Sequence, residues 1–194
     1  EVIDEAGGPH RGFLSADDYL SFDGGEFCHF GRMFLPALKP RSWWYLPPLG
    51  MLGSALPVAM ALKLAHPDSR VAMITGDGSF GFNAMEFDTA VRHNLALVAV
   101  LGNDSTWGID AHIQEGLYGR RVATDLLPTR YDLVVRGLGG HGEHVQHPDE
   151  LPSAIERAFQ AGRPALVNVE VQSAVSHRAE AAIARWRSSA PAGR

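Results

Sequence analysis

The sequence predicts an open α/β fold, in which a mainly parallel β-sheet carries helices on both faces. Three apolar runs, at residues 71–75, 95–101 and 165–171, lack the polar–apolar alternation of a one-sided strand, so each is expected to be buried on both faces. Segments with helical periodicity separate these runs, and that alternation is typical of a parallel sheet with helical crossovers. The length of 194 residues suits one domain of this kind.

The first half of the chain predicts a strand at 18–22, a helix at 26–38, a tightly turning loop and a central apolar helix at 54–65, a strand at 71–75 and a helix at 83–93. Asn83 is expected to cap the last of these helices in a capping-box pair with Glu86. A right-handed crossover then leads to the parallel strand at 95–101.

The second half begins with residues 103–130, which lack periodicity and are therefore expected to form a functional loop. A helix at 131–138, a strand at 143–146, a helix at 148–161 and the strand at 165–171 follow. We place one domain at residues 1–172 and an Ala/Arg-rich tail at 173–194, with a short helix through Trp186.

Composition argues against several classes of function. Seventeen Lys and Arg against 22 Asp and Glu give a net charge of −5, which offers no basic field for a nucleic-acid backbone or an anionic membrane. The uncharged stretch 42–62 is long enough to span a bilayer, but Gly50, Gly53 and Pro57 disfavour a spanning helix. The single cysteine, Cys28, predicts a reducing, cytoplasmic compartment, and no secretory leader is expected.

A glycine-rich loop follows the strand at 71–75. Residues 76–81 fit the pattern G-x-G-x-x-G of dinucleotide-binding domains, with Asp104 as the acid that would bind a ribose; a plain strand-to-helix turn is the other alternative. Asp77, however, would repel a pyrophosphate unless a cation lies between them, and Mg²⁺ prefers oxygen ligands. Asn103 ends the next predicted strand and is expected at the same sheet edge.

This pattern resembles the motif of the thiamine diphosphate (ThDP)-dependent enzymes. Residues 76–78 read Gly-Asp-Gly, and Asn103 follows after 24 further residues. The resemblance implies the ThDP-binding fold and a bound Mg²⁺, held by the side chains of Asp77 and Asn103 and by the main-chain carbonyl of Ser105, with two diphosphate oxygens and a water. The family often has Asn-Asn where this chain has Asn103-Asp104.

Residues 49–57 resemble the family segment that passes under the aminopyrimidine ring of ThDP. By this resemblance, the carbonyl of Gly50 accepts a hydrogen bond from the 4′-amino group, and Leu52 contacts the ring and bends the cofactor into a V shape. Gly50 and Leu52 are therefore the expected catalytic contacts. The cofactor site implied by the whole resemblance comprises Asp23, Gly24, Gly25, Gly50, Met51, Leu52, Gly76, Asp77, Gly78, Ser79, Phe80, Asn103, Ser105, Thr106, Trp107 and Gly108.

The resemblance also implies a partner. In the family, a glutamate from a separate pyrimidine-binding domain bonds the N1′ atom of the cofactor, and the 194 residues hold no such domain. The chain is expected to be a fragment of a longer protein or the small subunit of a split enzyme, assembled as a dimer or tetramer of heterodimers. Alone it should bind the cofactor weakly and catalyse nothing.

Three segments, at 86–93, 102–108 and 129–140, are most similar to 2-hydroxyacyl-CoA lyases and oxalyl-CoA decarboxylases. They imply a carbon–carbon lyase or carboligase acting on a 2-hydroxyacyl-CoA thioester; a 2-oxo-acid decarboxylase, acetolactate synthase or benzaldehyde lyase is the alternative. His112 and Tyr118 are candidates for proton transfer near the substrate. A dinucleotide-binding (NAD-type) domain and a non-catalytic assembly module are the alternatives from other classes.

Overall fold

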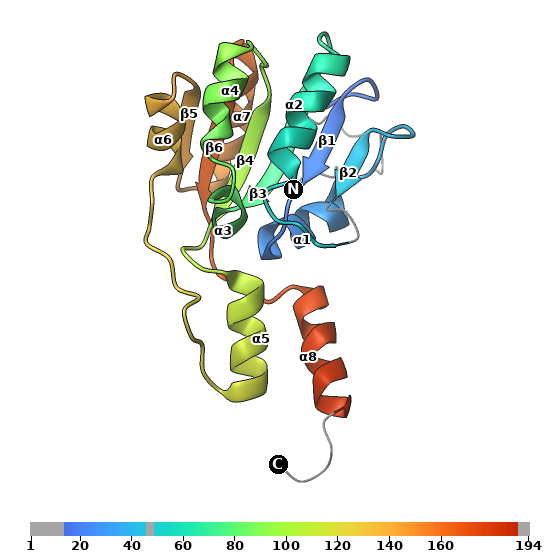
Figure 1. Ribbon diagram of the computed structural model, residues 1–194, viewed down its shortest axis with the longest axis vertical. Coiled ribbons are helices and arrows are strands. Elements are labelled where there is room, and N and C mark those ends of the chain that lie inside the picture. The colour runs from blue at the N-terminus through green and yellow to red at the C-terminus, as the bar shows by residue number, and fades with distance from the viewer. Residues whose placement is uncertain (1–13, 46–48, 190–194) are drawn as a thin grey trace.

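The computed structural model describes residues 14–45 and 49–189. Six strands form one sheet in the order β2-β1-β3-β4-β6-β5, and all neighbouring strands in it are parallel (Figure 1). The strands are β1 (Tyr19–Phe22), β2 (Trp43–Tyr45), β3 (Val71–Gly76), β4 (Val98–Asn103), β5 (His141–Val145) and β6 (Ala165–Glu170). The predicted fold class, an open parallel α/β sheet, is confirmed.

Helices cover both faces of this sheet. They are α1 (Glu26–Phe34), α2 (Ala55–Ala65), α3 (Asp77–Phe80), α4 (Glu86–Arg92), α5 (Gly108–Tyr118), α6 (Tyr131–Gly137), α7 (Leu151–Gln160) and α8 (His177–Ser189), with a 3₁₀ turn η1 at Pro148–Glu150. Helices α2, α3, α4 and α6 contribute to the hydrophobic cluster on one face. Helices α1 and α7 contribute to the cluster on the other.

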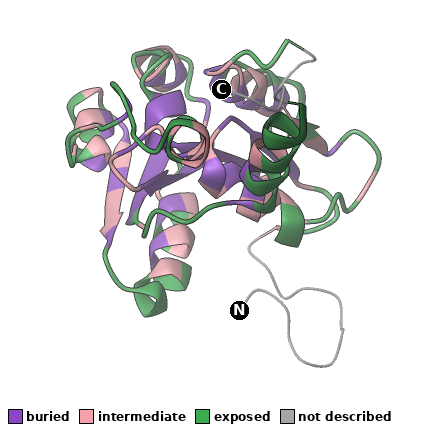
Figure 2. Ribbon diagram, turned by 90° about the horizontal axis from the view of Figure 1, so that it is seen from below, coloured by how far each residue is buried: buried purple, intermediate pink, exposed green. Residues whose placement is uncertain are grey.

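Alternate side chains along the buried strands contribute to the two clusters in turn. In β3, Val71 and Met73 point to the α2 side, and Ala72 and Ile74 point to the α1 side. All six residues of β3 are buried, which is why the strand reads as one apolar run. Figure 2 shows buried residues concentrated in the sheet, with exposure on the outer sides of the helices. Burial of a large side chain such as Phe87 contributes about 2–3 kcal/mol.

Helices α5 and α8 extend beyond the carboxyl-terminal edge of the sheet and lie side by side (Figure 1). A Cβ atom at Gly116 in α5 would lie 2.7 Å from Cδ1 of Ile183 in α8, so the glycine lets the two helices approach closely. Arg187 of α8 also donates to the carbonyl of Gly116. The predicted tail therefore contains an ordered helix that packs against the rest of the chain.

The aperiodic loop predicted for residues 103–130 is wrong in its first half, because helix α5 occupies Gly108–Tyr118. Two glycines inside the segment lower its helix propensity, and contacts with α8, distant in sequence, stabilise it. A local signal was present: Ile109, Ile113 and Leu117 recur every four residues, as on one face of a helix.

Asn83 does not cap a helix. Helix α4 begins at Glu86, and the side-chain amide of Asn83 instead donates to the carbonyl of Gly53 at 2.7 Å. A tertiary contact to the loop before α2 therefore replaces the local capping box.

The predicted turning loop after residue 41 contains the edge strand β2, which pairs with β1. The helix predicted for 26–38 ends at Phe34, and β4 begins at Val98 rather than at Leu95. Helix α2 is less central than predicted, since Leu64 on its outer side is 66% exposed.

In the described part of the chain, no helix is both long and apolar enough to cross a membrane.

Candidate cofactor site

The strand order places a topological switch point between β1 and β3. The connection after β1 leads to β2, its neighbour toward one edge of the sheet, and the connection after β3 leads to β4, toward the other edge. The loops after β1 and β3 therefore run in opposite directions and leave a crevice between them at the carboxyl ends of the two strands. A cavity of about 520 Å³ opens there. Its lining includes residues from the loops after β1, β3 and β4, the segment before α2, and the segment leading into α8.

Glycines line the part of this cavity nearest the strands. Gly24, Gly25, Gly76 and Gly78 all border it. A Cβ atom at Gly24 would lie 2.0 Å from Cδ2 of Leu52, and one at Gly78 would lie 2.9 Å from the ring of Trp107. Any larger residue at these two positions would displace a neighbouring side chain. The glycines thus keep the backbone of both loops accessible from the cavity.

Asp23 positions the segment that carries Gly50 and Leu52. Its carboxylate is fully buried and accepts hydrogen bonds from the backbone N–H groups of Gly24, Gly53 and Ala55 at 2.9–3.1 Å. The last of these is at the start of α2, so Asp23 fixes this helix to the end of β1. Its carboxylate does not line the cavity, whereas Gly50 and Leu52 do; Met51 is 56% exposed and lies outside the lining.

Asp77 is buried at the cavity wall. Its Oδ1 accepts from the N–H of Gly78 at 2.8 Å, and its Oδ2 accepts from the N–H of Thr106 at 3.2 Å. Burial is the largest influence on this carboxyl group and, together with the negative charge of Asp104, raises its pKa to about 6. The backbone hydrogen bonds oppose this rise.

Asp104, which was not a predicted metal ligand, is a second carboxylate at this cavity. Asp104 lines the same cavity as Asp77, and burial raises its pKa as well. Thr106 also lines the cavity, and its carbonyl accepts no hydrogen bond from any described residue. Two adjacent carboxylates and an open carbonyl are oxygen donors of the type that Mg²⁺ prefers.

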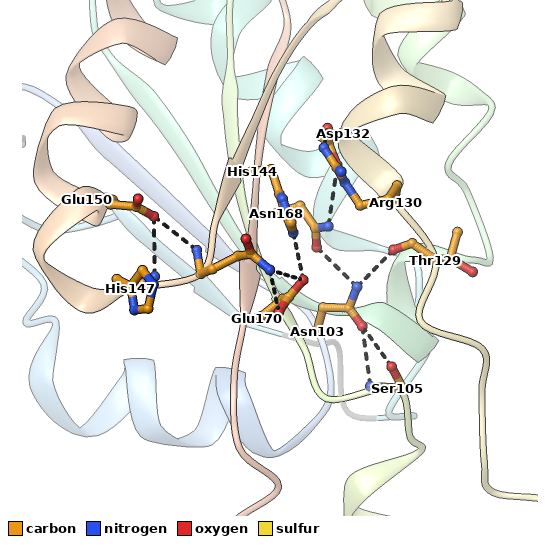
Figure 3. Close-up of polar contacts among 11 residues, drawn as sticks. Asn103, Ser105, Thr129, Arg130, Asp132, His144, His147, Glu150, Asn168 and Glu170 are labelled. Atoms are coloured by element: carbon orange, nitrogen blue, oxygen red, sulfur yellow. Dashed lines mark hydrogen bonds and ion pairs between the residues drawn. The ribbon is translucent and has the colours of Figure 1, made fainter.

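Asn103 and Ser105 are oriented differently from the prediction. The side-chain amide of Asn103 donates to the carbonyl of Thr129 at 2.9 Å and to Oδ1 of Asn168 at 3.2 Å, as Figure 3 shows. Its Oδ1 accepts from the N–H of Ser105 at 3.2 Å. The carbonyl of Ser105 accepts from the N–H of Leu126 at 2.7 Å. Neither residue lines the cavity, and the oxygens predicted to bind the metal, Oδ1 of Asn103 and the carbonyl of Ser105, accept hydrogen bonds from other groups.

The network around Asn103 continues away from the cavity. Asn168 donates to Oδ1 of Asp132 at 3.4 Å. The fully buried Asp132 carboxylate accepts from Nε and Nη2 of Arg130, each at 2.8 Å. Farther out, His144 lies 2.8 Å from Glu170 (Figure 3). These contacts join β4, β6 and the start of α6, and they hold the end of β4 in place.

The remaining predicted cofactor residues divide into two groups. Ser79, Trp107 and Gly108 line the cavity. Phe80 does not: its ring packs against Phe87 and Tyr131 in the hydrophobic cluster under the loop.

The two predicted proton-transfer residues lie outside the cavity lining. Nδ1 of His112 is 3.0 Å from Oε1 of the buried Glu26, and its Nε2 is 3.3 Å from Oγ of Ser173. Glu26 also accepts from the N–H of Ser176 at 3.1 Å. His112 therefore links α1, α5 and the segment before α8. Tyr118 is 70% exposed at the far end of α5.

Glu26, His29 and Arg178 are among the cavity residues that the sequence did not reveal. The first two lie in the first two turns of α1, and the third lies in α8. Arg178 lines the cavity with the two α1 residues only because α8 packs near it, and no local sequence pattern predicts that packing. Within the described residues, no group of three or more His, Cys, Asp or Glu side chains is arranged to hold a metal by itself.

An open parallel sheet with a glycine-lined cavity at its switch point is the architecture of α/β domains that bind a cofactor. Comparison with known families agrees: residues 23–169 match the family described as thiamine pyrophosphate enzyme, C-terminal TPP binding domain. The chain belongs to this family, and thiamine pyrophosphate, another name for ThDP, is its cofactor. The family resemblance inferred from the sequence is thereby confirmed.

Relatives of two kinds are similar to the chain. An acetolactate synthase large subunit, IlvG, of Mycobacterium tuberculosis is 47% identical over 165 residues, which is 84% of this chain and 30% of that protein. A 2-hydroxyacyl-CoA lyase 2 of Caenorhabditis elegans is 35% identical over 162 residues, 80% of this chain and 25% of that protein. A 2-hydroxyacyl-CoA lyase of Arabidopsis thaliana is 35% identical over 153 residues, 76% and 27% respectively. The chain thus spans less than a third of the length of these relatives.

Proposed function

We propose that this chain supplies the diphosphate- and Mg²⁺-binding half of a ThDP-dependent enzyme that makes or breaks a carbon–carbon bond. The observation that carries the proposal is that Asp77 and Asp104 line the same cavity, together with several glycines, and that the charge of Asp104 raises the pKa of Asp77. Both carboxyl groups have raised pKa values, and a divalent cation would relieve the cost of ionising them so close together. A dinucleotide site without metal would leave that cost in place, so the NAD-type alternative is disfavoured.

The proposed ligands of Mg²⁺ are the carboxylates of Asp77 and Asp104 and the carbonyl of Thr106. This set replaces Asn103 and Ser105, whose oxygens already accept hydrogen bonds outside the cavity. The diphosphate oxygens of the cofactor and water would complete the coordination of the ion.

The glycine-lined wall and Leu52 fit the rest of the cofactor. Gly24, Gly25 and Gly78 present backbone without side chains to the cavity, and Ser79 offers a hydroxyl. Leu52 lies against Gly24 and extends along the cavity wall, where it can support a bent cofactor. When bound, ThDP would supply an electron sink for the negative charge left on the former carbonyl carbon when a carbon–carbon bond to it breaks. The residues of this chain hold and bend the cofactor and exclude water from around it.

The proposal includes a partner that carries the pyrimidine-binding glutamate. The matched relatives are more than three times as long as the segment they share with this chain, so a complete site requires a further domain or subunit. We propose assembly as a dimer or tetramer of such heterodimers. The buried thiol of Cys28 suits a reducing, cytoplasmic setting.

Two reactions fit this class. One is lysis of a 2-hydroxyacyl-CoA thioester to an aldehyde and formyl-CoA, for which the 2-hydroxyacyl-CoA lyases are the similar proteins. The other is carboligation or decarboxylation of a 2-oxo acid, for which the acetolactate synthase at 47% identity argues.

The test is to purify the chain with whatever subunit or domain accompanies it, load Mg²⁺ and ThDP, and assay pyruvate and a 2-hydroxyacyl-CoA separately. Turnover of either one, dependent on both Mg²⁺ and ThDP, supports the proposal. Tight binding of NAD without metal, with no binding of ThDP, would refute it.

A further inference from the structure

His29 is a buried polar residue at the cavity with no assigned partner. It lies in α1, is only 7% exposed and lines the cavity. Its Nδ1 atom is buried and has no hydrogen-bond partner among the residues that the structure describes. Buried imidazole nitrogens are normally satisfied. Within the described residues no hydrogen bond is made by the His29 ring, which leaves its other nitrogen available to a molecule in the cavity.

The surroundings of His29 determine its charge and its tautomer. Burial, followed by the positive charges of Arg178 and Arg32, lowers its pKa to about 4, with Glu26 opposing. The ring is therefore neutral near pH 7. A buried acceptor without a partner is less costly than a buried N–H without one, so the proton belongs on Nε2. Because Nδ1 is buried, Nε2–H is the group left to face the cavity as a hydrogen-bond donor.

Arg178 of α8 is the second unusual residue here. It is the one Lys or Arg side chain among the described residues that line the cavity. It forms no ion pair with any carboxylate in the described part of the chain, although Asp77, Asp104 and Asp110 border the same cavity. Arg178 and His29 line the same cavity, and the positive charge of Arg178 lowers the pKa of His29. A donor imidazole and an unpaired guanidinium on the wall of one cavity are suited to an anionic oxygen.

We propose that His29 and Arg178 form the carboxylate-recognition end of the substrate site, in which His29 Nε2–H donates to a substrate carboxylate and Arg178 balances its charge. This inference rests on the proposed function, and it chooses between the two substrate classes named there. A 2-oxo acid carries a carboxylate next to its reacting carbonyl, whereas a 2-hydroxyacyl thioester has none at that position. The substrate class that fits this end of the cavity is therefore a 2-oxo acid.

The test uses the complete assembly, loaded with Mg²⁺ and ThDP. His29→Phe removes the donor and keeps a ring, and Arg178→Gln removes the charge at an exposed position. Each should raise the KM for pyruvate about tenfold or more, with kcat within about threefold of wild type. His29→Gln places an amide N–H near the position of Nε2 and should restore the KM to within about threefold. Arg185→Gln, an exposed change on the same helix, is the matched control.

Binding of an unreactive probe provides a readout that does not depend on turnover. Oxamate has the shape and carboxylate of a 2-oxo acid, and oxamide is its neutral counterpart. Calorimetry should show that Arg178→Gln weakens oxamate about tenfold and leaves oxamide unchanged. Wild-type protein that fails to bind oxamate, or variants with unchanged KM and oxamate affinity, would overturn the inference. Failure of the wild-type assembly to bind Mg²⁺ and ThDP would instead refute the proposed function, and the oxamate titration would still decide the inference.

Discussion

The backbone N–H of Thr106 donates a hydrogen bond to Oδ2 of Asp77 across 3.2 Å. This contact ties the segment after β4 to the loop after β3, at the edge where the two parallel strands end. It brings the Thr106 backbone and the neighbouring Asp104 to the same cavity as Asp77. The arrangement of oxygen donors thus exists in the protein itself, which reduces the reorganisation that a metal ion must impose.

The first prediction concerns which residue at the carboxyl end of β4 binds the metal, Asn103 or Asp104. Asp104→Ala should weaken Mg²⁺-dependent binding of ThDP by about 100-fold, because it removes a proposed ligand rather than a supporting group, whose loss costs about 10–100-fold. Asp104→Asn keeps one oxygen donor and should lose about tenfold or less. Calorimetry with ThDP at fixed Mg²⁺ measures both.

Asn103→Ala is the matched control, because it alters the adjacent side chain. It removes the bonds to Thr129 and Asn168 and should lower stability by about 1–3 kcal/mol, with a smaller effect on ThDP affinity than Asp104→Ala. A larger loss of affinity in Asn103→Ala than in Asp104→Ala would show that the ligand set derived from the sequence is the right one.

The contrast between Asn103 and Asp104 shows which part of the metal site could be predicted from the sequence and which could not. The glycine loop and Asp77 were predictable, because a carboxylate in such a loop after a buried strand implies a cation. Asn103 ends β4 and Asp104 follows it. Which of the two faces Asp77 depends on the side to which each side chain points, since neighbours in an extended segment point to opposite sides. The Asn103 amide donates hydrogen bonds to Thr129 and Asn168, which are distant from it in sequence. No local sequence pattern predicts those contacts.

The second prediction concerns pH and the metal-free protein. The folded-state pKa of Asp77, about 6, lies above its ordinary value. The stability that its protonated form contributes is therefore present below about pH 4 and lost as pH rises to about 6, an effect of order 2–3 kcal/mol. Chemical denaturation in EDTA should show the free energy of unfolding falling over this window.

Asp77→Asn isolates that contribution, because Asp23 and Asp104 also have raised pKa values and change stability in the same direction. The variant should show a shallower decline in stability between pH 4 and pH 6. An identical slope in the wild type and the variant would mean that Asp77 titrates normally.

The third prediction concerns the contact between Gly24 and Leu52. A Cβ atom at residue 24 would lie 2.0 Å from Cδ2 of Leu52, so Gly24→Ala must displace that side chain. ThDP affinity should fall about tenfold or more through misplacement of the wall against which the cofactor bends. The double variant Gly24→Ala/Leu52→Ala removes the clash, and its measured affinity should equal that of Leu52→Ala alone. Simple addition of the two losses would show that the residues act independently.

The fourth prediction concerns the attachment of α8. The buried Glu26 carboxylate binds both His112 and the N–H of Ser176, so Glu26→Ala leaves a buried donor without a partner at a cost of about 1–3 kcal/mol. The segment from residue 173 through α8 should then exchange its amide hydrogens faster, while β3 and β4 remain protected. Hydrogen-exchange mass spectrometry compares these segments directly. Glu180→Ala, an exposed change in α8, is the control, and loss of protection across the whole sheet in Glu26→Ala would mean that Glu26 stabilises the entire fold rather than the position of α8.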